Sequence, residues 1–245
     1  MADLRSKILI LVEGAKTDVQ LMEKLLMLYQ FDEKYQIVSY NTNIYTLYQE
    51  MFHENDPDSM DLLQVLKARE SDPDRKKIFD EAYSDILLVF DLDPQDPAYT
   101  SEKIRRMAEY FVESSDMGKL YLNYPMVEAF YHMEKIPDPK FRDYYATLEE
   151  LRSGSYKRRV NRENRNHDYR KFAINTEECS IVILQNIEKA QKLCGIQHEL
   201  LPTQLDILNQ EITLLNEEQR VSVLCTCAFF IPEYRVDLLK GVHEA

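Results

Sequence analysis

The fold of this chain is decided by two apolar stretches that end in acid, Ile8-Leu9-Ile10-Leu11-Val12-Glu13-Gly14 and Ile86-Leu87-Leu88-Val89-Phe90-Asp91-Leu92-Asp93. Each contains five consecutive apolar residues, which is typical of a strand buried on both faces of a sheet. Residues 36–40 and 119–123 are two further short, mainly apolar segments that we interpret as strands. Because helix-patterned segments separate three of these runs, the sequence predicts an α/β fold with a parallel four-stranded sheet flanked by helices.

We expect the chain to divide into an α/β part, residues 1–135, and a helical C-terminal region, residues 136–245. Helical patterns also fill residues 41–84, which is longer than a plain crossover needs, and we interpret this segment as a helical insertion. Pro125 suits the first turn of a helix that follows the fourth strand. Beyond it the patterns favour helices throughout, residues 218–230 included, so no further strand is expected.

Charge is distributed unevenly along the chain, whose formal net charge is −13. Such an acidic protein repels nucleic acid unless basic residues are concentrated locally. Residues 152–171 hold eight basic and two acidic residues. The segment is either an ordinary solvated helix face or an arm that binds phosphates. In the second interpretation Arg158, Arg159, Arg162 and Arg165 contact a nucleic-acid backbone without reading its sequence.

Cysteine usage and hydropathy predict a cytoplasmic protein with no membrane segment. The four cysteines lie in the last third of the chain without a CxxC pair, and no signal peptide opens the sequence. We therefore expect reduced thiols in the cytoplasm. The longest apolar run, residues 221–231, is too short to span a membrane.

The acids that end the first and third strands predict a metal site. If the strand order is 2-1-3-4, these strands are neighbours at the topological switch point, where doubly wound sheets bind ligands. Glu13, Asp91 and Asp93 then converge, and a hard divalent cation, Mg²⁺ or Mn²⁺, relieves their repulsion. Gly14 allows a sharp turn and leaves room for a phosphate at the start of the next helix.

The same residues resemble a known family. Leu11-Val12-Glu13-Gly14-Ala15-Lys16-Thr17-Asp18 and Val89-Phe90-Asp91-Leu92-Asp93 are similar to the Toprim domain of topoisomerases, primases and OLD-type nucleases, over roughly the first 135 residues. The resemblance implies magnesium-dependent cutting or joining of phosphodiesters. It makes Glu13 a general acid/base or a metal ligand, and Asp91 and Asp93 metal ligands. The glycine and third acid that follow the Asp pair in topoisomerases are absent, and Asp96 is their nearest substitute, which argues against a topoisomerase or primase.

A second likeness extends the site. Asn123-Tyr124-Pro125-Met126-Val127-Glu128-Ala129-Phe130 resembles the Asn-Pro-x-x-Glu element of RloB-like bacterial defence proteins, with Tyr124 inserted. By this resemblance Glu128 is a further metal ligand, as two-metal phosphoryl chemistry requires, and the chain acts in bacterial defence. Phosphoryl transfer also needs a cation besides metal, and Lys157, at the start of the basic segment, is our candidate for this catalytic role.

The most direct interpretation is a metal-dependent nuclease that cleaves DNA or RNA. One alternative is a haloacid-dehalogenase-like phosphatase with Asp91 as nucleophile, although Gln95 occupies the place where that family has Thr or Val. Another is a catalytically inactive Toprim module that binds or regulates, which the acidic composition favours. The sequence is equally compatible with a protein partner and with any oligomeric state.

Overall fold

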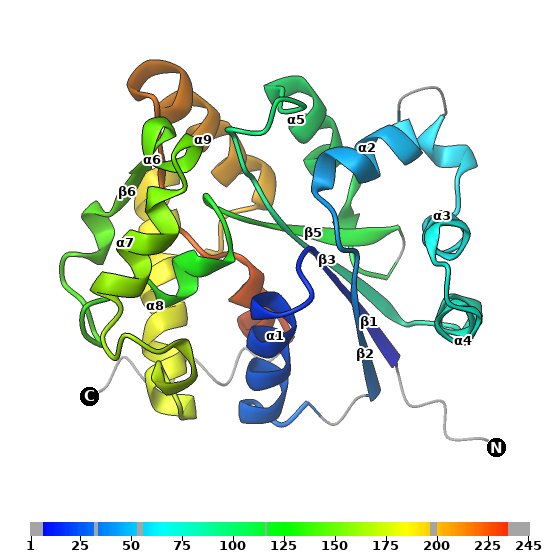
Figure 1. Ribbon diagram of the computed structural model, residues 1–245, viewed down its shortest axis with the longest axis horizontal. Coiled ribbons are helices and arrows are strands. Elements are labelled where there is room, and N and C mark those ends of the chain that lie inside the picture. Colours follow the sequence, from blue (N-terminus) through cyan, green and yellow to red (C-terminus); the bar gives the residue numbers. More distant parts are fainter. Residues whose placement is uncertain (1–6, 32–33, 53–55, 116, 197–199, 235–245) are drawn as a thin grey trace.

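The computed structural model describes residues 7–31, 34–52, 56–115, 117–196 and 200–234. At its centre lies a five-stranded sheet in the order β2-β1-β3-β5-β4, seen nearly edge-on in Figure 1. Its strands are β1 (Lys7–Val12), β2 (Lys34–Ser39), β3 (Asp85–Asp91), β4 (Val112–Glu113) and β5 (Gly118–Asn123). The first four in this spatial order pair in parallel, and β4 pairs antiparallel with β5. The prediction of an α/β fold with a mostly parallel sheet is confirmed.

The predicted strand count is wrong by one. The additional strand, β4, has only two residues, and both of its side chains are exposed at the edge of the sheet. A strand this short carries no alternating pattern that could be recognised from sequence. The four predicted strands occupy the order 2-1-3-4 that the site prediction assumed.

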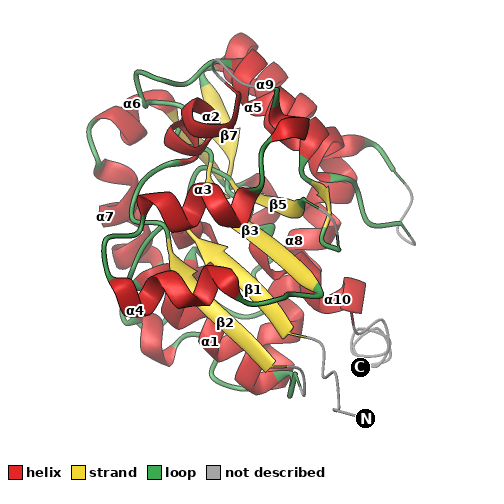
Figure 2. Cartoon of the chain, turned by 90° about the vertical axis from the view of Figure 1, so that its right-hand side faces the viewer, coloured by secondary structure: helices red, strands yellow, loops and turns green. Residues whose placement is uncertain are grey.

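Helices cover both faces of the sheet. Figure 2 shows α3 and α4 lying across β1 and β2 on one face, whereas α1 lies on the other. The bounds of all helices in the described residues are as follows. The α-helices are α1 (Thr17–Leu28), α2 (Ile44–Phe52), α3 (Leu62–Arg69), α4 (Pro73–Lys76), α5 (Ser101–Tyr110), α6 (Leu148–Arg152), α7 (Ser155–Glu163), α8 (Thr176–Cys194), α9 (Gln204–Glu218) and α10 (Phe230–Tyr234). Short 3-10 helices are η1 (Pro57–Ser59), η2 (Lys77–Asp80), η3 (Val127–Tyr131), η4 (Phe141–Asp143), η5 (Tyr169–Lys171) and η6 (Cys227–Phe229).

The expectation of no strand after Pro125 is wrong. Strands β6 (Tyr145–Thr147) and β7 (Arg220–Ser222) form a two-stranded antiparallel sheet, and residues 218–230 are not one helix. The chain beyond β7 stays extended, and Leu224 exchanges two backbone hydrogen bonds with Tyr124, at 2.7 and 2.8 Å. Since this run is fully buried, its apolar residues show no periodicity that separates strand from helix.

The C-terminal segments pack directly against the α/β part. The hydroxyl of Tyr29, the residue that follows α1, lies 2.9 Å from the Ser180 hydroxyl of α8, and α9 packs on α5. Buried apolar side chains from the whole described chain join one hydrophobic core. The division near residue 135 stays a prediction. Of the described residues, no helix is long and apolar enough to cross a membrane.

Candidate metal centre

The carboxyl ends of β1 and β3 bring Glu13 and Asp91 together. Glu13 directly follows β1, and its backbone N–H donates to the Val89 carbonyl at 3.1 Å, which continues the ladder between the two strands. Its carboxylate oxygen Oε2 in turn accepts the backbone N–H of Asp91 at 3.2 Å. Pairing of β1 with β3 therefore places these two acids side by side, as the sequence predicted.

Asp91, the last residue of β3, and Asp93, two residues later, are both held by the end of the neighbouring strand β5 and the residues that follow it. Asp91 is almost fully buried, and its Oδ1 accepts a hydrogen bond from the Asn123 side-chain amide at 3.2 Å. Asp93 has a left-handed backbone with φ of 40°, a conformation that aspartate tolerates better than most residues. Its backbone N–H donates to the Pro125 carbonyl at 3.2 Å, and its carboxylate accepts from the Gln95 amide at 2.9 Å.

Two residues from later in the chain, Glu128 in η3 and Lys157 in α7, complete the cluster. Glu128 lies in η3, a 3-10 helix that begins at Val127, so Pro125 does not open the α-helix that the sequence predicted. Glu128 is buried, and its Oε1 pairs with the Lys157 ammonium of α7 at 3.1 Å. Burial lowers the pKa of Lys157, but the carboxylates of Glu128, Asp91 and Asp93 raise it more, so this lysine stays charged.

Asp18 is a fifth acid in the cluster that the sequence analysis did not identify as a site residue. Helix α1 begins at Thr17 without a side-chain cap, and Asp18, in its first turn, is only 6% exposed. Its carboxylate accepts the backbone N–H of Gly14. A Cβ on residue 14 would lie 2.6 Å from Asp18 Oδ2, so Gly14 is needed to admit this carboxylate. The signal available in the sequence was the acid five residues after Glu13.

Burial and mutual repulsion raise the pKa values of four of these acids, Glu13, Asp18, Asp91 and Asp93. Burial first, and then the charges of Asp93 and Asp18, raise the pKa of Glu13 from 4.5 to about 8, although the Asp91 N–H and Lys157 act in the opposite direction. Burial likewise raises the pKa of Asp91, with contributions from Glu13 and Asp18 among others. The pKa values of Asp93 and Asp18 are also raised, first by burial and then by neighbouring acids such as Glu128. The five carboxylates thus form one electrostatic unit.

The donor chemistry of this cluster suits a hard divalent cation. All five side chains offer carboxylate oxygens, the ligands that Mg²⁺ and Mn²⁺ prefer. Asp18 Oδ1 and Glu128 Oε2 are buried and have no hydrogen-bond partner among the described residues, a costly state that a cation would relieve. As the described side chains stand, no three acidic, histidine or cysteine residues are arranged to share a metal ion. A cation shared by three of these residues would need their side chains to adopt other orientations.

The four arginines of the basic segment have different environments. Arg158 and Arg162 are exposed on α7, and Arg162 pairs with its neighbour Glu163 at 2.8 Å. Arg159 is half-buried: it pairs with Glu150 at 3.0 Å and donates to the Tyr145 carbonyl at 2.5 Å. Arg165 pairs with Glu178 at 2.7 Å. Arg158 and Arg162 are therefore the better placed of the four to contact a phosphate backbone.

Comparisons of the chain with models of known families, with curated proteins and with solved structures found no match. What connects the chain to a known chemistry is accordingly the pair of acidic motifs together with the arrangement of the residues that they bring into contact.

Proposed function

We propose that this chain is a Toprim-like, metal-dependent phosphodiesterase that cleaves nucleic acid. The observation that carries the proposal is the convergence of acids from four separate elements with one lysine at a single edge of the sheet. Those elements are the ends of β1 and β3, the first turn of α1, and η3. Structural ion networks on protein surfaces seldom concentrate so many buried acids beside so few cations, whereas phosphoryl-transfer sites do.

The topology supports the Toprim-like assignment. The chain crosses from β1 outward to β2 and then back to β3 on the other side of β1. The crevice at this switch point is where doubly wound sheets bind ligands, and Glu13 and Asp91 lie at the strand ends that border it. The resemblance to Toprim domains also includes the order of the motifs along the chain, with the first acid after β1 and the Asp-x-Asp pair at the end of β3.

Roles follow from these positions. Asp91, Asp93 and Glu13 would hold one divalent cation, and Asp18 and Glu128 would hold or orient a second. When bound, such cations polarise the phosphoryl group and lower the pKa of attacking water. Glu13 is placed to exchange a proton with that water or with the leaving oxygen.

Lys157 is the residue of the cluster that can exchange its present partner for a substrate phosphate. Its side chain is 56% exposed although its ammonium pairs with buried Glu128. A phosphate that approaches the cluster would compete with Glu128 for this ammonium, and the lysine would then stabilise negative charge on the scissile group. Arg158, the next residue on α7, extends the positive surface outward along the path of a nucleic-acid backbone.

Cleavage assays test the proposal. Purified chain is incubated with single-stranded RNA and with duplex DNA, in Mg²⁺, in Mn²⁺ and in EDTA. We expect metal-dependent cleavage of at least one substrate. Asp91→Asn should abolish it, and Lys157→Gln should lower kcat by about 100-fold. Asp74→Asn, an 86% exposed acid on α4, is the matched control and should cleave normally. Cleavage that survives Asp91→Asn would refute the assignment. The role in bacterial defence stays a prediction from the RloB-like resemblance, and phage challenge of cells that express the chain tests it.

A further inference from the structure

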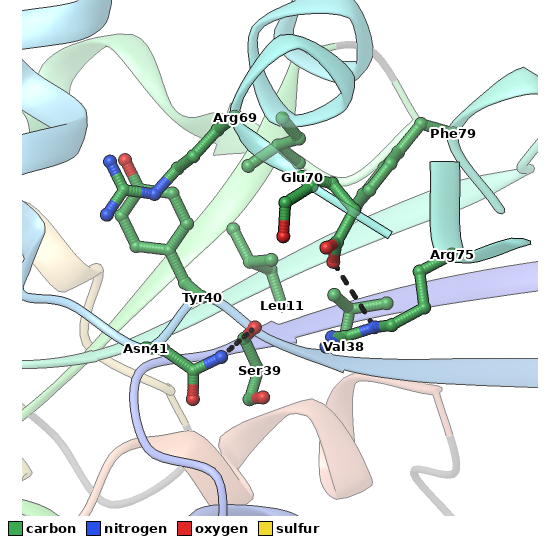
Figure 3. A pocket seen from close by; sticks show the side chains of 11 residues that line it. Leu11, Val38, Ser39, Tyr40, Asn41, Arg69, Glu70, Arg75 and Phe79 are labelled. Carbon is green, nitrogen blue, oxygen red and sulfur yellow. Dashed lines mark hydrogen bonds and ion pairs between the residues drawn. The ribbon is translucent and has the colours of Figure 1, made fainter. Parts of the chain in front are cut away.

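A polar pocket lies beside the acidic cluster, between the helical insertion and the β1–β2 side of the sheet. Its volume is about 500 Å³, and it is lined by the ends of β1 and β2, by α3 and by the segment around α4. Figure 3 shows Arg69 and Arg75 on opposite sides of this space, with Ser39 and Asn41 below them. None of the roles proposed above uses this pocket.

The pocket brings two arginines together in an otherwise acidic part of the chain. Residues 1–151 hold 17 basic and 30 acidic residues, yet two arginines and one acid, Glu70, line this space. Arg75 pairs with Glu70 through Nε at 3.2 Å. Among the described residues its two terminal nitrogens have no hydrogen-bond or ion-pair partner. They are therefore available for a bidentate contact with phosphate, which guanidinium geometry favours.

Arg69 offers a different surface. Its guanidinium lies 4.7 Å from the centre of the Tyr40 ring and is fixed by Glu50 at 2.7 Å. A guanidinium that is layered on an aromatic ring provides a flat platform on which nucleobases stack. Leu11 and Phe79 are buried apolar residues that also line the pocket. The pocket thus combines a hydrogen-bond donor for phosphate, a flat group for stacking against a base, and apolar lining residues. Within such a volume these features match one nucleoside monophosphate unit.

The pocket adjoins the proposed catalytic cluster through the backbone. Asn41, which lines it, donates its backbone N–H to the Glu13 carbonyl at 2.9 Å. Leu11 of β1, which also lines the pocket, lies two residues before Glu13 in the sequence. If the scissile phosphate of a nucleic-acid strand contacts the cluster, a neighbouring nucleotide of the same strand would therefore lie at this pocket.

We propose that this pocket binds one nucleotide of the nucleic-acid strand that the acidic cluster cleaves, with Arg75 on its phosphate and Arg69 against its base. The inference rests on the proposed function for the identity of the strand. A free nucleotide has the same chemistry, so the experiment distinguishes the two sources.

The test titrates adenosine 5′-monophosphate into the full chain by calorimetry in EDTA, so that no metal contributes. Adenosine and inorganic phosphate are titrated in parallel. We expect the monophosphate to bind more tightly than either fragment, and Arg75→Gln to weaken it about tenfold, the value of one charge-assisted contact. Lys77→Gln is the matched control because this residue is 75% exposed and pairs with Asp74 nearby. Asp91→Asn should bind the monophosphate like the wild type.

A short single-stranded oligonucleotide should displace the bound monophosphate, and Arg75→Gln should raise the KM for cleavage without lowering kcat. Failure of the oligonucleotide to displace it would overturn the strand assignment in favour of a free nucleotide. Equal affinity for adenosine and its monophosphate, or unchanged affinity in Arg75→Gln, would overturn the pocket itself. Normal monophosphate binding by a chain that cleaves nothing would count against the proposed function instead.

Discussion

Replacing Glu13 with glutamine should change the pH dependence of stability in a defined direction. Glutamine keeps an acceptor for the Asp91 N–H but cannot ionise. Burial raises the folded-state pKa of Glu13 from 4.5 to about 8, so between these values the folded protein binds more protons at this position than the unfolded chain does. Stability that is present at low pH is therefore lost as the pH rises through this window.

The size of the effect follows from the same two values. Between pH 5 and pH 8, a single carboxyl with this shift contributes a loss of at most about 3.5 kcal/mol in the free energy of unfolding. Coupling to the neighbouring acids spreads the titration, so we expect about 2–3 kcal/mol of difference between the wild type and Glu13→Gln across this range. At pH 8 the variant should be the more stable protein.

Urea unfolding followed by circular dichroism, in EDTA and at several pH values, measures this difference directly. Asp74→Asn serves as the control for an exposed acid and should follow the wild-type curve. Mg²⁺ at pH 8 should stabilise the wild type more than Glu13→Gln, because a cation that binds only the folded cluster shifts the equilibrium by mass action. Parallel pH profiles for wild type and Glu13→Gln would refute the electrostatic account of the cluster.

Three further predictions concern other parts of the molecule. Lys189 is buried in α8 and donates to two backbone carbonyls, so Lys189→Met should lower the free energy of unfolding by about 2–4 kcal/mol, whereas exposed Lys192→Met should change it little. The double substitution of Arg158 and Arg162 by Gln should weaken nucleic-acid binding for all sequences and flatten its salt dependence by about one log–log unit per lost contact; an unchanged slope would exclude them from the interface. Treatment with beryllium fluoride should give no adduct on Asp91, and an adduct in a crystal structure would favour the phosphatase alternative.

The centre of the sheet was predictable because its two middle strands, β1 and β3, each contain five consecutive apolar residues. The runs that contain Leu11 and Leu88 are buried on both faces, and only parallel strands covered by helices on both sides need such sequences. The same property made the acids predictable, since Glu13 and Asp91 follow these runs directly and parallel strands end at one edge.

The C-terminal strands were not predictable from the same signals. Val221 and Val223 belong to an apolar run that is buried in a helical environment, and its pairing with β6 joins residues far apart in sequence. Asp18 was missed for a related reason. A polar residue near a helix start is most often a cap, and only the close approach of Gly14 reveals that its carboxylate enters the cluster.

Calorimetric titration of Mn²⁺ into the metal-free chain is the decisive test of the metal centre. We expect saturable binding that releases protons, because carboxyls that are protonated in the metal-free cluster must ionise to coordinate the cation. Asp91→Asn should abolish that binding and Asp74→Asn should preserve it. Wild-type protein that binds no Mn²⁺, or Asp91→Asn that binds it with unchanged affinity, would contradict a metal centre at the ends of β1 and β3.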